Sequence, residues 1–386
     1  MRGVTMILAG VSVAVLAACS QPTQTSQGSS PQPGQPAGAP APAAGLTPQQ
    51  TSLMEAANSA AFTPAVEEET RAQPKPPVDS TAVDAQPGAA QAGPQPDPVL
   101  IRAQVMLDRT AFSPGAVDGL KGENMRQAIA AFEQANGMTV DGKLDQQVWD
   151  ALARDTRPVL ASYTITQADV QGPWTTLPPK DDYEAMAAVD RLGYQSPSEA
   201  LAERFHMDEK LLRALNPGVD FTRPGVAIVV ADPGDQALPA KVARIEVDKK
   251  EKAVRAYDEA DQLIGFYPAT IGSSDMPTPS GTWKVTAVQK DPVWNYDPAK
   301  LNFGKAKRKL TIPAGPNNPV GLVWIDLSKP TYGIHGTPDP EKIGKTDSHG
   351  CVRLTNWDAL QLAAAVDNGI EVAFVTAPKK KASSKA

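Results

Sequence analysis

The segment HGTPDPEKIGKTDSHGCVRLTN, residues 335–356, carries the most chemical information in this sequence. It holds two of the three histidines of the 386-residue chain and one of its two cysteines, Cys351. The other cysteine, Cys19, follows an N-terminal apolar run, so no disulfide framework is available. A free thiol among histidines and glycines makes a poor packed core, which favours a chemical role.

The residue types of this segment fit nucleophilic acyl transfer. A thiol is a weak nucleophile at neutral pH unless an imidazole accepts its proton, so Cys351 is the candidate nucleophile and His335 its candidate base. In an extended stretch His349, Cys351 and Arg353 point to one side, which puts a cation beside the thiol to lower its pKa or to hold a substrate carboxylate. Gly350 leaves the backbone open, and nearby backbone N–H groups are available to stabilise an oxyanion.

The sequence on both sides of the segment predicts a mainly β domain. Alternating or β-branched apolar runs predict strands over 242–247, 253–257, 263–267, 281–288, 320–327 and 370–375. One strong helix is predicted over Trp357 to Val366, with Thr355 and Asn356 as N-cap candidates. We expect a sandwich or barrel-like β fold with this single strong helix.

These motifs resemble those of L,D-transpeptidases with a YkuD-type catalytic domain, which carry His, a spacer, Ser/Thr-His-Gly-Cys-x-Arg and Asn. The resemblance extends over 242–376 and includes the family's Thr-Pro-x-Gly strand entry at Thr278-Pro279-Ser280-Gly281. It implies that Cys351 attacks the third residue of a peptidoglycan stem tetrapeptide and releases D-alanine. The amine of a neighbouring stem would then resolve the thioester into a 3-3 cross-link. His335 would move the proton, oriented by a main-chain carbonyl near Gly336. The supporting pocket residues that the family implies are Gly336, Ser348, His349, Gly350, Arg353 and Asn356.

Other readings of the same residues stay open. Water as the acyl acceptor would make an L,D-carboxypeptidase or cross-link hydrolase, and a lysine of an outer-membrane protein would make a protein-to-peptidoglycan ligase. The sequence does not separate these, because pocket shape and water exclusion choose the acceptor. A metal site of His335, His349, Cys351 and Asp347 has suitable ligand types but lacks paired ligand spacing. No nucleotide-binding glycine loop follows a strand, so no cofactor is expected.

The N-terminus predicts export and lipidation. Residues 1–18 hold an apolar run that is short for a membrane span and typical of a signal peptide. Leu16-Ala17-Ala18-Cys19 resembles the lipobox of bacterial lipoproteins, which implies that Cys19 is acylated. Ser20 is similar to the residue that directs Gram-negative lipoproteins to the outer membrane. We therefore expect a lipid-anchored protein on the periplasmic face of the cell envelope.

Between Cys19 and residue 98 the chain predicts a disordered tether. Proline, alanine and glutamine dominate, and Phe62 is the one aromatic residue, which leaves too little apolar side chain to offset the entropy of ordering. A short helix is expected after Thr47-Pro48. Such a tether would let an anchored domain reach the peptidoglycan layer.

Two small modules are predicted between the tether and the β region. Residues 99–155 carry apolar positions at helical spacing, which predicts three short helices and resembles a peptidoglycan-binding domain. Residues 163–232 predict a strand, two helices and a strand, similar to a divergent glycan-binding LysM module with an insertion around 173–182. The lone His206 there is expected to be a packing residue. The basic tail, 377–386, is predicted to be disordered.

Charge limits the class of partner. Lys and Arg total 37 against 43 Asp and Glu, a formal charge of −6, so no nucleic-acid partner is expected. The expected partners are peptidoglycan stem peptides and glycan, a membrane through the lipid, and an outer-membrane protein if one is the acceptor. A non-enzymatic scaffold that tethers the outer membrane to the wall is the alternative from another class.

Overall fold

The structure, a computed structural model, describes residues 45–64, 95–235, 237–273, 277–301, 303–348 and 350–376. The predicted signal peptide, Cys19, most of the tether, His349 and the tail at 377–386 lie outside the described residues. Within the described ranges, no helix has both the length and the apolar character that a membrane span requires.

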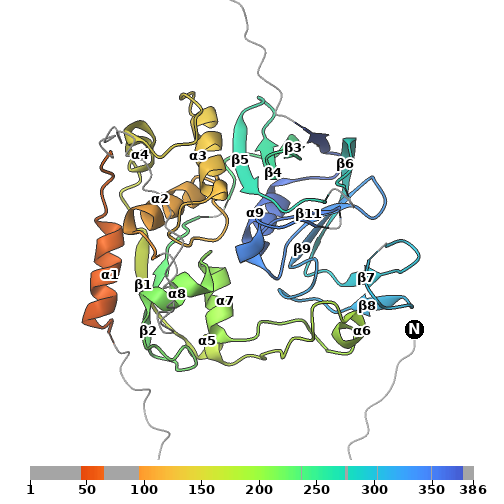
Figure 1. Cartoon of the computed structure of the whole chain (residues 1–386), viewed down its shortest axis with the longest axis horizontal. Coiled ribbons are helices and arrows are strands. Elements are labelled where there is room, and N and C mark those ends of the chain that lie inside the picture. The colour runs from red at the N-terminus through yellow and green to blue at the C-terminus, as the bar shows by residue number, and fades with distance from the viewer. Residues whose placement is uncertain are drawn as a thin grey trace, which may run out of the picture. The chain divides into compact units, whose positions relative to one another are not determined.

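The C-terminal region is built on a mixed eight-stranded sheet with the order β11-β10-β9-β6-β12-β3-β4-β5 (Figure 1). Neighbouring strands are antiparallel except in the pairs β12–β3 and β10–β11. A separate hairpin, β7–β8, projects beside the sheet. The strands are β3 (Arg244–Asp248), β4 (Ala253–Tyr257), β5 (Leu263–Pro268), β6 (Gly281–Lys290), β7 (Trp294–Tyr296), β8 (Leu310–Ile312), β9 (Val323–Leu327), β10 (Gly333–His335), β11 (Val352–Arg353) and β12 (Glu371–Val375).

The mainly β fold class with one strong helix is confirmed. Helix α9 (Asn356–Ala365) begins where Thr355 caps it, because the Thr355 hydroxyl accepts the N–H of Asp358 at 3.1 Å. Its apolar face, with Ala359 and Leu362 fully buried, packs against β9 and β10. The short strands β7, β8, β10 and β11 were not predicted, since two or three residues give no measurable alternation.

The N-terminal region is mainly helical. The three helices expected over 99–155 are present, and the strand, helix, helix, strand order expected over 163–232 is also observed, with β1 and β2 antiparallel. The short helices α5 and α6 were not predicted. The elements are α2 (Pro98–Arg109), α3 (Glu123–Ala135), α4 (Gln146–Leu152), β1 (Leu160–Thr164), α5 (Gln167–Val170), α6 (Tyr183–Met186), α7 (Pro197–Arg204), α8 (Glu209–Leu215), β2 (Ala227–Ala231) and the 3₁₀ turn Pro340–Lys342.

The helical region and the sheet share apolar packing. Phe112, which follows α2, pairs through its backbone with Phe266 on β5 and packs edge-on against Phe132 of α3 at 5.9 Å between ring centroids. The buried cluster that contains these rings also includes Leu107 and Tyr257. The regions predicted as separate modules therefore bury side chains against one another.

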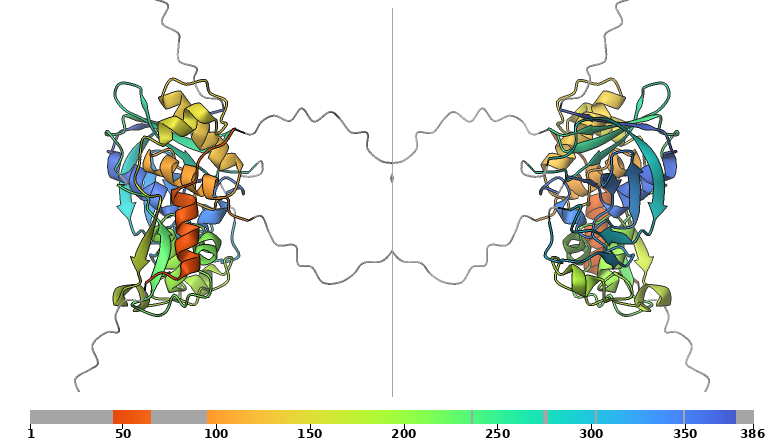
Figure 2. Two further views of the ribbon diagram at one scale, coloured as in Figure 1. Left: turned by 90° about the vertical axis from the view of Figure 1, so that its left-hand side faces the viewer. Right: turned by 90° about the vertical axis from the view of Figure 1, so that its right-hand side faces the viewer.

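Helix α1 (Pro48–Asn58) corrects the expected tether. The short helix after Thr47 is present, with a capping box between Thr47 and Gln50. It is docked rather than free: the Gln50 amide donates to Asn216 at 2.8 Å, and the Asn58 side-chain oxygen accepts the backbone N–H of Leu160 at 2.8 Å. Both side views show α1, in orange-red, lying against the helical region (Figure 2). The prediction of an unpacked chain is therefore wrong over residues 45–64.

His206 has the packing role that was expected. It is buried, its Nδ1 lies 2.8 Å from a carboxylate oxygen of Asp108, and its ring stacks on Trp357 of α9 at 4.9 Å. This contact ties the second helical module to the helix beneath the sheet.

Replacement of Asn216 by alanine is expected to lower the free energy of unfolding by about 3 kcal/mol. The side chain is 2% exposed, donates to the carbonyls of Leu212 and Val229, and accepts the N–H of Val229 at 2.7 Å. Alanine leaves these buried groups without partners. Urea unfolding of Asn216→Ala beside the exposed control Asn295→Ala measures the difference, and equal stabilities would contradict the prediction.

Candidate active site

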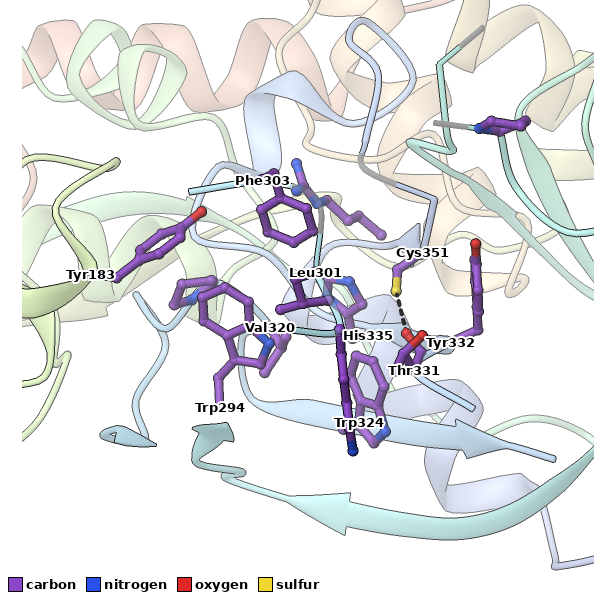
Figure 3. Close-up of a pocket in the computed structure, with 14 residues that line it drawn as sticks. Tyr183, Trp294, Leu301, Phe303, Val320, Trp324, Thr331, Tyr332, His335 and Cys351 are labelled. Carbon is purple, nitrogen blue, oxygen red and sulfur yellow. Dashed lines mark hydrogen bonds between the residues drawn. The ribbon is translucent and has the colours of Figure 1, made fainter. Parts of the chain in front are cut away.

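Cys351 and His335 line one cavity, of about 310 Å³. Pairing of β10 with β11 brings them together, because Ile334 lies opposite Val352 and His335 lies opposite Arg353 in parallel register. Two residues sixteen positions apart thus come from neighbouring strands. Figure 3 shows both side chains facing a space with aromatic walls; the rings that line it belong to Tyr183, Trp294, Phe303, Trp324 and Tyr332.

His335 is held as a neutral imidazole with a defined tautomer. It is 3% exposed, and its Nδ1 lies 2.7 Å from the carbonyl oxygen of Gly336. A carbonyl only accepts, so Nδ1 carries the proton and Nε2 keeps a free lone pair. Burial lowers the pKa of His335 to about 3, with the nearby Arg353 adding to the shift and the bond to Gly336 opposing it. Trp324 stacks on the ring at 5.3 Å.

Cys351 is held as a thiol. Its Sγ donates to the carbonyl of Thr331 at 3.6 Å. Removal from water raises the pKa of the Cys351 thiol above its ordinary value, against the opposing effects of the Gly333 N–H and the Arg353 charge. The group therefore needs a base to become a nucleophile at neutral pH, and the neutral His335 on the same cavity can serve as one.

The loop before the thiol is fixed by two hydroxyl groups. Ser348 donates to the carbonyl of Cys351 at 2.6 Å and accepts the N–H of Gly350 at 3.1 Å. Thr278 donates to the carbonyl of Gly350 at 3.0 Å and accepts the N–H of Gly272 at 2.7 Å. Gly350 has φ +119°, a conformation that side chains rarely adopt. The Thr-Pro-x-Gly entry thus supports the cysteine loop directly.

Arg353 lies between two cavities. It lines the thiol cavity and a second one of about 560 Å³. Its Nε is buried and has no hydrogen-bond partner among the described residues. Burial also lowers the pKa of the Arg353 guanidinium. A desolvated guanidinium without a counter-ion is a strong receptor for a carboxylate.

Asn356 acts from behind the pocket. It is 1% exposed, and its Oδ1 accepts the backbone N–H groups of Leu322 at 3.0 Å and Thr337 at 3.2 Å. Neither cavity has Asn356 on its wall. It was expected to shape the pocket, and it does so by holding two backbone segments rather than by facing the substrate space. His349 lies outside the described residues.

The sequence analysis missed the arm, residues 173–195, as part of the site. Tyr183 from the arm packs on Trp294 and Tyr296 of the β7 strand, at 5.1 and 5.0 Å between ring centroids. Lys180 forms an ion pair with Asp339, and Leu192 exchanges backbone hydrogen bonds with the segment before β9. The only sequence signal was the insertion expected around 173–182. No group of three or more His, Cys, Asp or Glu that could hold a metal occurs in the described part of the chain.

Comparisons with known proteins identify two matched segments. Residues 242–374 match the model of the L,D-transpeptidase catalytic domain called YkuD, and residues 97–152 match the "Putative peptidoglycan binding domain". The chain is 31% identical over 176 residues to the "Putative L,D-transpeptidase YkuD" of Bacillus licheniformis, which covers 46% of this chain and 92% of that protein. It is 33% identical over 194 residues to the "Probable L,D-transpeptidase YbiS" of Escherichia coli K12, covering 49% of this chain and 63% of that protein.

Solved structures also match. L,D-transpeptidase 3 from Mycobacterium tuberculosis, in complex with a faropenem-derived adduct, aligns with TM-score 0.29 and 16% identity over 35% of this chain and 60% of that chain. The catalytic domain of the Enterococcus faecium L,D-transpeptidase, acylated by ertapenem, aligns with TM-score 0.29 and 20% identity over 35% of this chain and 98% of that chain.

Alkylation of Cys351 is expected to accelerate with pH, with a midpoint above the ordinary thiol value of about 8.5. Burial raises the pKa of the thiol, so the reactive thiolate becomes abundant only on the alkaline side. Arg353→Gln should move the midpoint further up, because the guanidinium charge lowers the pKa of the thiol. Iodoacetamide rates, followed by intact mass on the chain from residue 45 onward, measure both; a midpoint below 7 would contradict the buried thiol.

Proposed function

Since this chain belongs to the L,D-transpeptidase family, we propose that it joins peptidoglycan stems through a Cys351 thioester with His335 as the base. The observation that carries the proposal is the hydrogen bond from His335 Nδ1 to the Gly336 carbonyl, in a cavity that also holds the thiol. It leaves Nε2 as the ring nitrogen able to take a proton.

In the first half-reaction His335 Nε2 takes the Cys351 proton, and Sγ attacks the carbonyl of the third stem residue. The amide bond to the terminal D-alanine breaks, the proton passes from His335 to the departing amine, and a thioester remains. In the second half-reaction a stem amine gives a proton to His335 and attacks the thioester. The 3-3 amide forms, and Cys351 recovers its proton. Arg353 is suited to bind a stem carboxylate throughout.

The aromatic walls favour transfer over hydrolysis. Tyr183, Trp294 and Phe303 line the cavity from the arm and the β7–β8 hairpin, so they limit the access of water to a thioester on Cys351. An amine acceptor must displace fewer ordered waters from such a cavity than from an open, polar one. Carboxypeptidase, cross-link hydrolase and protein-ligase activities remain outcomes that the acceptor test distinguishes.

We also propose the location of this activity. The peptidoglycan-binding match over 97–152 supports a protein that works at the cell wall. The Leu16-Ala17-Ala18-Cys19 motif supports a lipid anchor on Cys19 and, with Ser20, the outer membrane. A LysM-like role for residues 163–232 in glycan binding rests on their element order alone.

Incubation of the chain from residue 45 onward with a tetrapeptide-stem muropeptide is expected to give an acyl adduct on Cys351, released D-alanine and a 3-3 cross-linked dimer. Intact-mass analysis and muropeptide chromatography measure these products, with Cys351→Ala as the control. Adduct that turns over to tripeptide alone would favour the hydrolase. No adduct and no D-alanine from folded, reduced protein would sink the enzyme and leave the tethering scaffold.

A further inference from the structure

Glu203 reaches the catalytic region from outside it. The residue lies on α7, before the segment matched to the catalytic family, which begins at residue 242. Its Oε1 accepts the side-chain amide N–H of Asn356 at 2.9 Å and the hydroxyl of Tyr194 at 2.9 Å. A helix of the preceding module thus ends a contact that begins on α9, beneath the active site.

The contact continues to the catalytic base through one peptide unit. His335 Nδ1 donates to the carbonyl of Gly336 at 2.7 Å, and the N–H on the other side of that same peptide, from Thr337, donates to Asn356 Oδ1 at 3.2 Å. The Asn356 amide then donates to Glu203. Each group in this chain accepts from the side of His335 and donates toward Glu203. Aligned hydrogen bonds of this kind polarise and strengthen one another.

The middle of the chain has almost no freedom to move. A Cβ added to Gly321 or to Gly336 would come within 2.1 Å of Asn356 Oδ1. Asn356 also donates to the carbonyl of Pro316 at 3.2 Å, so its amide is fixed on both edges. A side chain packed this closely transmits the loss of a partner to the backbone that it holds.

The end of the chain is a carboxyl group enclosed away from water. Burial raises the pKa of Glu203 to about 7, opposed by the bonds from Asn356 and Tyr194. Glu199 adds to the rise and His206 opposes it. In either protonation state Oε1 can accept both bonds, provided that an added proton sits on Oε2. The role of Glu203 therefore depends on an acceptor oxygen at this place.

We propose that Glu203 is a positioning residue, which terminates the hydrogen-bond chain that holds His335 in the tautomer needed to activate Cys351. This inference rests on the proposed acyl transfer. It makes the helical module a working part of the active site, in addition to any role in binding the wall. The module supplies one acceptor oxygen, which orients Asn356, then the Gly336–Thr337 peptide and finally the imidazole.

The test compares two substitutions of Glu203 in the full chain. Glu203→Gln keeps an oxygen that can accept both bonds and should retain acylation within about threefold of the unchanged protein. Glu203→Leu removes it and should lower kcat for acylation on the order of tenfold, the scale seen when a supporting partner of an active-site histidine is removed. KM for the soluble stem should change less than twofold, because Glu203 lines neither cavity.

Ser113→Ala is the matched control, because it removes another buried contact between the helical region and α9, the bond to Asp358 at 3.1 Å, without touching Asn356. It should acylate like the unchanged protein. Thermal unfolding of every variant checks that it is folded. Folded Glu203→Leu that acylates at the unchanged rate would overturn the proposal, as would an equal loss in Ser113→Ala or no rescue by Gln. If the unchanged protein itself forms no adduct, the acyl-transfer proposal is what has failed.

Discussion

The hydrogen bond from His335 Nδ1 to the Gly336 carbonyl is the interaction on which the site depends. It fixes which ring nitrogen carries the proton, while burial holds the pKa of the imidazole near 3 and keeps the ring neutral. A neutral imidazole beside a thiol of raised pKa is a resting state without charge separation. The charges then develop only when a substrate fills the cavity, where fixed dipoles replace water.

The sheet serves this interaction by its order rather than by its size. β10 and β11 are short and lie at one edge, and their parallel pairing delivers His335 and the residue after Cys351 to the same end. Parallel neighbours need a long connection, and here residues 336–351 supply it. That connection is held by Ser348, Thr278 and Asn356, so the loop with the thiol has hydroxyl and amide supports on both sides.

The accessory elements are packed into the enzyme rather than strung along it. Helix α1 docks through Gln50 and Asn58, the arm places Tyr183 on the wall of the cavity, and His206 stacks on Trp357. Each contact joins residues more than a hundred positions apart. Such contacts bury surfaces that an isolated catalytic domain would leave exposed to water.

The sequence by itself determined the local features. It predicted the nucleophile and base by residue type, most of the longer strands by alternation, α9 by its cap, and the helix after Thr47 by its proline. These depend on neighbours along the chain, so short windows contain them. Only the tertiary structure decided that residues 45–64 are docked, that the arm walls the cavity, that Asn356 works from behind it and that Glu203 reaches Asn356. Those facts depend on which surfaces meet, and no local periodicity encodes the pairing of distant segments.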